Sequence, residues 1–140
     1  MTTEFPLTGI DYVARLEPGR EAVGVRNVPA TLALFDSHFP RFPVLPGVLL
    51  LQSMAQTAAL ALGDARGWLL DGAEVVRFRH AVRPGDRAVV TARVLDAGAE
   101  GASCSAVVHV EGRAVATARR LRLVRAHTHL NEATGGGTPT

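Results

Sequence analysis

The chain has 140 residues, a length that fits one domain burying about two-thirds of the surface its unfolded chain would expose. Lys and Arg number 15 against 13 Asp and Glu, and no basic patch interleaved with aromatic residues is present, which argues against nucleic-acid binding. A single cysteine, Cys104, excludes an intramolecular disulfide, and the N-terminus lacks signal-peptide features. A cytoplasmic protein with a core of Val, Leu and Ala is expected.

The first predicted elements are two strands, over residues 12–16 and 21–28, joined at a turn containing Pro18 and Gly19. A short connector, with room for one helical turn, follows over residues 29–36.

A helix is predicted over residues 46–62. Pro46 suits its first position, because the missing N–H has no helical partner there, and Gly63 suits the left-handed conformation that ends a helix. The helix is apolar on nearly all sides, so the rest of the chain is expected to wrap around it. Its apolar run is shorter than the roughly 20 residues of a membrane span, and polar residues interrupt it, so no membrane partner is expected.

The second half predicts an antiparallel meander. Its expected strands cover residues 68–70, 75–82, 87–95, 102–110 and 114–124. One buried helix and a sheet of five to seven strands make an α+β domain in which the sheet curls around the helix. The domain is expected over residues 1–125, and residues 126–140, which end in a Gly-rich run, are expected to be a disordered tail.

The segment before and within the helix carries the chain's most informative motif. It consists of His38-Phe39-Pro40, then Pro43, then Pro46-Gly47-Val48-Leu49, then Met54-Ala55-Gln56. Together with Arg77-Phe78-Arg79 and the turn at residues 82–86, this motif resembles the hotdog-fold 3-hydroxyacyl-(acyl-carrier-protein) dehydratases. The resemblance covers about residues 6–124 and implies the hotdog fold.

The resemblance also implies a site. His38 would be the acid/base, and the backbone N–H of Gly47 would polarise the substrate thioester. In the family, a Glu or Asp from the other subunit of a dimer stands 14 residues after the histidine, and here that position is Gln52. The implied partners are acyl carrier protein and a second hotdog subunit, identical or homologous. No cofactor or metal is implied.

The chemistry of dehydration agrees with these roles except at Gln52. The reaction needs a base for the C2 proton, an acid for the departing hydroxyl and a donor to the enolate-like oxygen. An amide cannot donate a catalytic proton, so Gln52 either positions a water or hydroxyl or is a buried structural amide. Asp36, two residues from His38, is an alternative acid.

Other residues receive weaker assignments. Phe39, Val48, Leu51 and Gln56 are candidates for contact with the acyl chain, although Gln56 also fits a structural hydrogen bond. Arg77, Arg79 and Arg83 are candidates for docking the acidic carrier protein or the pantetheine phosphate, the alternative being a solvated strand face. His80 and His109 are expected on strands, and His127 and His129 are not expected to bind metal.

Four functions remain open from the sequence. The first is a dehydratase of 3-hydroxyacyl chains on a carrier protein, in fatty acid or polyketide-type biosynthesis. The second is a subunit that gains the missing carboxylate from a homologous partner. The third is a hotdog thioesterase in which Gln52 orients a water, and the fourth is a non-catalytic acyl-carrier-binding subunit.

Overall fold

The structure, a computed structural model, describes residues 9–29, 44–64 and 66–126. Within them lie one helix and six strands. Their bounds are β1 Tyr12–Glu17, β2 Glu21–Asn27, α2 Gly47–Ala61, β3 Trp68–Phe78, β4 Arg87–Ala97, β5 Gly101–Val110 and β6 Arg113–Arg125. Of the predicted tail over residues 126–140, only Ala126 is described: it is buried, and its N–H donates to the carbonyl of Gly67 at 2.9 Å. Residues 127–140 lie outside the described part.

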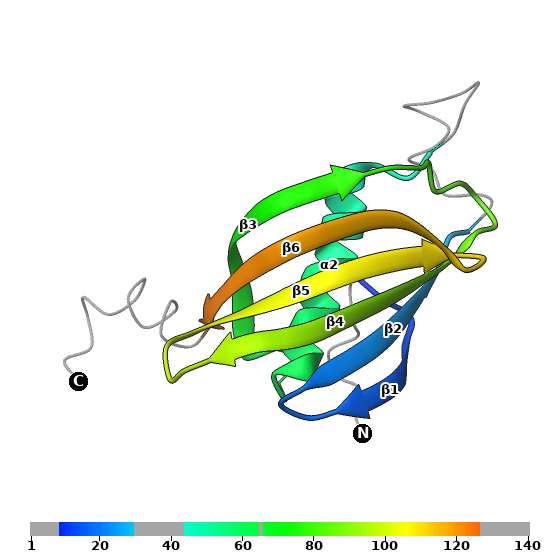
Figure 1. Cartoon of the computed structure of the whole chain (residues 1–140). Coiled ribbons are helices and arrows are strands. Elements are labelled where there is room, and N and C mark those ends of the chain that lie inside the picture. The colour runs from blue at the N-terminus through cyan, green and yellow to red at the C-terminus, as the bar shows by residue number, and fades with distance from the viewer. Residues whose placement is uncertain (1–8, 30–43, 65, 127–140) are drawn as a thin grey trace, which may run out of the picture.

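The six strands form one antiparallel sheet in the order β1-β2-β4-β5-β6-β3. The sheet curls, and α2 lies against its concave face with its axis across the strands (Figure 1). β3 follows the helix in sequence but pairs only with β6, so it forms an edge of the sheet. This arrangement confirms the predicted α+β class and the hotdog fold.

Small residues on the inner face of the sheet let the helix approach closely. Six of them are alanines with at most 5% of their surface exposed: Ala22, Ala88, Ala92, Ala106, Ala116 and Ala118. From the helix, Met54, Ala58 and Ala61 pack into this surface and are fully buried. The core is therefore built from Ala, Val and Leu, as the scarcity of aromatic residues predicted.

The helix boundaries differ slightly from those predicted. Pro46 immediately precedes the helix, with a ψ of 144°, instead of forming its first residue. Gly63 has a φ of +97° and follows the last turn, which confirms its predicted role as the terminator. The sheet curls around the helix from one side, as predicted, and on the other side Val48 is 69% exposed and Gln52 is also exposed.

The two strands predicted over residues 68–70 and 75–82 are one strand, β3, that ends at Phe78. Its pairing with β6 shifts between Leu70 and Gly72, and Val75 adopts a φ of +53°. Both irregularities interrupt the alternation of side chains, which explains why the sequence pattern showed two short strands.

No helix in the described part of the chain is long and apolar enough to cross a membrane.

Candidate active site at the start of the helix

A cavity of about 340 Å³ lies where the helix begins. Gly47, the first helical residue, and Leu50 line it from α2, and Phe78 to Val82 line it from the end of β3 and the segment that follows. The Phe78 ring lies so close to Gly47 that a Cβ built on the glycine would stand 2.9 Å from Cζ of the ring. A side chain at this position would have to displace the ring, whereas glycine lets the ring lie against the start of the helix.

The start of the helix presents unused hydrogen-bond donors. The N–H groups of Gly47 and Val48 donate to no other residue in the described part of the chain, as expected for the first turn of a helix. The first turn carries no acidic side chain that would offset the positive end of the helix dipole. An oxygen that gains negative charge at Gly47 would therefore be stabilised by both the N–H group and the dipole.

The wall opposite the helix is held in place by backbone hydrogen bonds. The N–H of Leu45 donates to the carbonyl of Val82 at 2.6 Å, which joins the segment before the helix to the segment after β3. The N–H groups of Arg79 and His80 both donate to the carbonyl of Val115, at 2.7 and 3.3 Å. The cavity is thus bounded by backbone that is tied to the sheet.

Sequence reasoning placed His80 on a strand and gave it no function. The strand placement is wrong, because β3 ends at Phe78 and the exposed His80 lies just beyond it, lining the cavity beside Arg79. His80 lies at the helix start because β3 ends at Phe78, earlier than predicted. Nothing in the local sequence indicates that the strand ends there. His109, by contrast, lies on β5 as predicted and is half-buried.

Gln52 lies on the open side of α2 and lines a second, smaller cavity of about 160 Å³. Gln56, one turn further along, and Trp68, Leu69 and Leu70 from the start of β3 also line it. Because Gln52 is exposed in the isolated chain, the alternative that it is a buried structural amide is wrong for this chain alone. Gln56 is half-buried and has an interaction partner.

The remaining predicted residues fall into two groups. His38, Phe39 and Asp36 lie outside the described residues, so their roles stay predictions. Val48 and Leu51 are described: Val48 points away from the core with 69% of its surface exposed, while Leu51 is half-buried and packs against the core.

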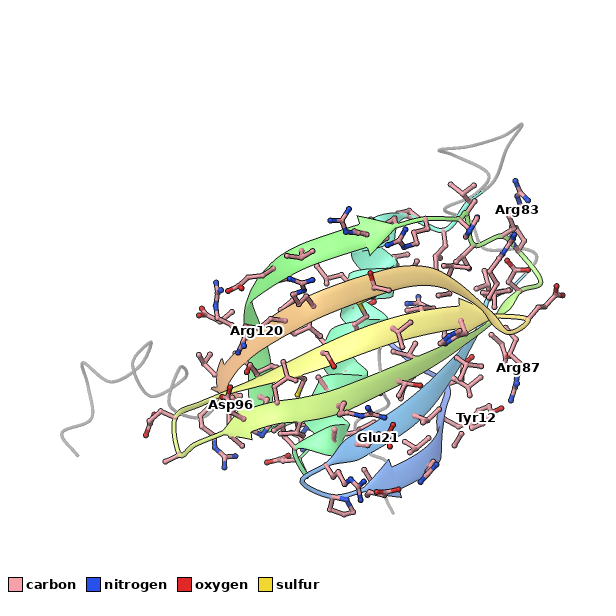
Figure 2. The ribbon with its side chains drawn as sticks, viewed as in Figure 1. Tyr12, Glu21, Arg83, Arg87, Asp96 and Arg120 are labelled. Atoms are coloured by element: carbon pink, nitrogen blue, oxygen red, sulfur yellow. The ribbon has the colours of Figure 1, made fainter. Side chains whose placement is uncertain are left out.

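The predicted docking arginines are all exposed and lie toward the end of the sheet where the helix begins. Arg79 lines the cavity at Gly47, whereas Arg83 lines a neighbouring cavity of about 450 Å³ together with Arg113. Figure 2 shows Arg83 and Arg87 at this end, and Asp96 and Arg120 at the other. Arg113 was missed, although the Glu111-Gly112 turn that brings it here is visible in the sequence.

The described residues contain no group of three or more His, Cys, Asp or Glu side chains that could hold a metal ion. Cys104 is fully buried, and burial, with a smaller effect of Asp96, raises the pKa of its thiol to about 11. The thiol is therefore protonated at neutral pH and is a core residue rather than a nucleophile.

Comparison with known proteins adds to these observations. Residues 15–118 match the family model described as "ApeI-like: ApeI dehydratase". The chain is 40% identical over 96 residues to the 3-hydroxyacyl-(acyl-carrier-protein) dehydratase FabZ of Ruminiclostridium cellulolyticum, covering 65% of this chain and 68% of that protein. It is 34% identical to the FabZ of a Geobacillus strain, covering 79% and 80% of the two chains.

Among solved structures, a chain of the dehydratase heterocomplex ApeI:P from Xenorhabdus doucetiae superimposes with a TM-score of 0.70. The match covers 94% of this chain and 92% of that one at 18% sequence identity, and it supports the fold alone.

Proposed function

From the premise that the chain belongs to the ApeI-like dehydratase family, we propose that it removes water from 3-hydroxyacyl chains bound as thioesters to acyl carrier protein. The two relatives that are 34–40% identical are named for this substrate, which supports the same substrate class here. The reaction would serve fatty acid or polyketide-type biosynthesis. The cytoplasmic location expected from the sequence stays a prediction.

In the proposed reaction, a base removes a proton from C2 of the acyl chain. The electron pair of that C–H bond forms the C2=C3 double bond, the C3–O bond breaks, and the hydroxyl leaves as water after accepting a proton. His38 would act as the acid/base, removing the C2 proton and passing it to the departing hydroxyl, and Gln52 would hold that hydroxyl by hydrogen bonds without supplying a proton. Substrate and product differ by one water, and no oxidant or cofactor is needed.

The observation that carries the proposal is the open cavity at Gly47. The Gly47 N–H, which donates to no other residue in the described part of the chain, and the positive end of the helix dipole suit the thioester oxygen, which gains negative charge as the C2 proton leaves. Arg79, on the rim of the same cavity, suits the phosphodiester of the pantetheine arm, with Arg83 and Arg77 as further contacts for an acidic carrier.

A second hotdog subunit would complete the site. β3 is an edge strand, and its exposed apolar side chains include Leu69, Leu70, Val75 and Phe78. An edge of this kind is a template for pairing with another strand. Pairing there would cover the open side of the helix, and the resemblance implies that Gln52 would then serve the site of the other subunit.

The test uses the purified full chain and a 3-hydroxyacyl-carrier substrate, with intact-mass measurement of the carrier. We expect loss of the mass of one water, and we expect His38→Ala to abolish it. Release of the free acid would instead support a thioesterase, and an unchanged carrier would support a binding subunit. Either of these outcomes would contradict the proposal.

Gln52→Glu tests the altered position directly. Restoring a proton donor is expected to raise kcat, since a general acid contributes about 10²- to 10⁴-fold. A fall in activity would show that the amide has its own role in this site. Gln56→Glu, one helical turn away on the same open side, is the matched control and is expected to leave kcat below that of Gln52→Glu.

A complementing heterodimer is the second candidate, and the exposure of Gln52 favours it. A carboxylate on a homologous partner would complete one His38 site, and the other site would keep Gln52. Mixing the chain with a Glu-bearing homologue should then raise the rate well above the sum of the separate rates. A full rate from the chain alone would contradict this candidate.

A further inference from the structure

Arg26 on β2 makes contacts that join the sheet to the helix turn carrying Gln52. Its Nη1 donates to the carbonyl oxygen of Leu49 and to the hydroxyl of Ser53, both at 3.0 Å. The side chain is half-buried, and burial lowers the pKa of its guanidinium, an effect that nearby Asp11 partly offsets. Arg26 lines none of the three cavities described above.

Ser53 extends this connection to the N-terminal segment. It is fully buried, and its hydroxyl donates to the carbonyl of Gly9 at 2.5 Å while accepting from Arg26. A Cβ built on Gly9 would stand 2.7 Å from the carbonyl oxygen of Gln52, so Gly9 packs directly on this turn. The turn from Leu49 to Ser53 is therefore held from two sides.

Packing between β2 and α2 does not require a charged side chain at the position of Arg26. An apolar side chain could fill a half-buried position between β2 and α2 at a lower cost of desolvation. Arginine instead donates to a carbonyl in the first turns of the helix, where the helix dipole is positive and a cation is not favoured. A function for the guanidinium beyond stability would explain its presence.

We infer that Arg26 is a positioning residue, which fixes the rotation of the Leu49–Ser53 turn and thereby the direction of the Gln52 side chain. The inference rests on the proposed function, in which Gln52 acts on the substrate. A helix has a radius of about 6 Å with its side chains, so a rotation of about 20° moves the end of a side chain by about 2 Å. Displacements of about 1 Å can cost about 10²-fold in rate.

The test compares Arg26→Met with Arg93→Met. Arg93 lies on β4, is exposed and pairs with Glu21 at 3.2 Å, so its replacement makes the same chemical change away from the helix. We expect Arg26→Met to lower kcat by about 10- to 100-fold with KM for the carrier substrate unchanged. Arg93→Met is expected to keep both constants, and Arg26→Lys, which keeps the charge and one donor, should recover part of kcat.

A second readout does not depend on turnover. The side-chain amide signal of Gln52 in a ¹H–¹⁵N spectrum, assigned by its loss in Gln52→Glu, is expected to shift in Arg26→Met and to stay in place in Arg93→Met. If the wild-type chain dehydrates no substrate, the proposed function fails while this spectrum still tests the position of Gln52. The inference would be overturned if the Gln52 signal does not move in Arg26→Met. It would also be overturned if Arg26→Met lowers kcat no more than Arg93→Met does.

Ser53→Ala covers the case in which Arg26→Met does not fold. It removes only the hydroxyl that accepts from Arg26 and donates to Gly9. We expect a smaller fall in kcat and a shift of the Gln52 signal in the same direction. Where Arg26→Met does fold, the fold-reduction of kcat in the double variant Arg26→Met/Ser53→Ala should be smaller than the product of the two single reductions, because both residues act through one turn. A fully multiplicative loss would contradict a shared action.

Discussion

Gly47→Ala is the substitution whose effect follows most directly from the geometry of the site. The added methyl group would meet three atoms of the Phe78 ring, at 2.9, 3.1 and 3.2 Å. Carbon atoms in contact prefer about 3.5–4.0 Å, so the ring must move by several tenths of an ångström or more. Phe78 is 51% exposed, which leaves it free to swing outward or into the cavity.

Because the Phe78 ring can move, the substitution is expected to change stability little and activity strongly. Overpacking costs about 1–3 kcal/mol in a rigid core, and an exposed ring puts the cost near the lower end. Alanine also favours a helix over glycine by up to about 1 kcal/mol. The free energy of unfolding is therefore expected to change by less than about 1 kcal/mol. The rate should fall by about 10²-fold, because the methyl group and the displaced ring would crowd the N–H that we propose faces the substrate oxygen.

The assay is kcat/KM for dehydration of a 3-hydroxyacyl-carrier substrate, measured beside the melting temperature. Phe78→Ala and the double variant Gly47→Ala/Phe78→Ala complete a cycle that isolates the contact. If the clash causes the loss, the double variant should be no slower than Phe78→Ala. Wild-type activity in Gly47→Ala, or fully independent losses in the cycle, would refute the reasoning.

Three other predictions address the core, the buried thiol and the proposed docking arginine Arg79. Gly24→Ala should cost about 1–3 kcal/mol in chemical denaturation, because its Cβ would lie 2.9 Å from Oγ1 of the buried Thr57; an unchanged midpoint would contradict this. Burial raises the pKa of Cys104 to about 11, so the protonated thiol stabilises the fold fully below the unfolded pKa near 9. This stabilisation, about 2–3 kcal/mol, is lost as pH rises toward 11. Cys104→Ala should flatten the decline over that range, and an equally steep decline would count against it. Arg79→Ala should raise KM for the carrier substrate about three- to tenfold at low salt and less at high salt, whereas Arg119→Ala, an exposed control on β6, should not.

The sequence predicted the fold because its signals are local and agree with one another. The turns at Gly19 and Gly112 have a positive φ, and each joins two paired strands that were predicted from the sequence. Gly85 also has a positive φ, but it lies between β3 and β4, which do not pair with each other. Gly63 ended the helix as predicted for the same reason. β3 was harder, because Val75 takes a φ of +53° that β-branched residues rarely adopt and that no sequence pattern announces.

The site was predicted less completely, since it is assembled by contacts distant in sequence. Gly47 came from the family motif, but the reason for the glycine, the Phe78 ring, lies 31 residues later in the chain. His80 reaches the same cavity only because β3 ends two residues earlier. Arg26 was missed altogether, because an arginine in a strand resembles any solvent-exposed charge until the helix is placed beside it.

The helix explains why apolar content alone could not show where the site lies. Its sequence is apolar almost all round, yet its sides meet different surroundings. Met54 and its neighbours pack on the alanines of the sheet, Ser53 meets the polar contacts of Arg26, and Gln52 remains open. The alanines of β2, β4, β5 and β6 decide which side is buried, because only they allow close approach. The polar contacts then fix the rotation, and the open side that results presents Gln52 toward the edge strand where a second subunit would pair.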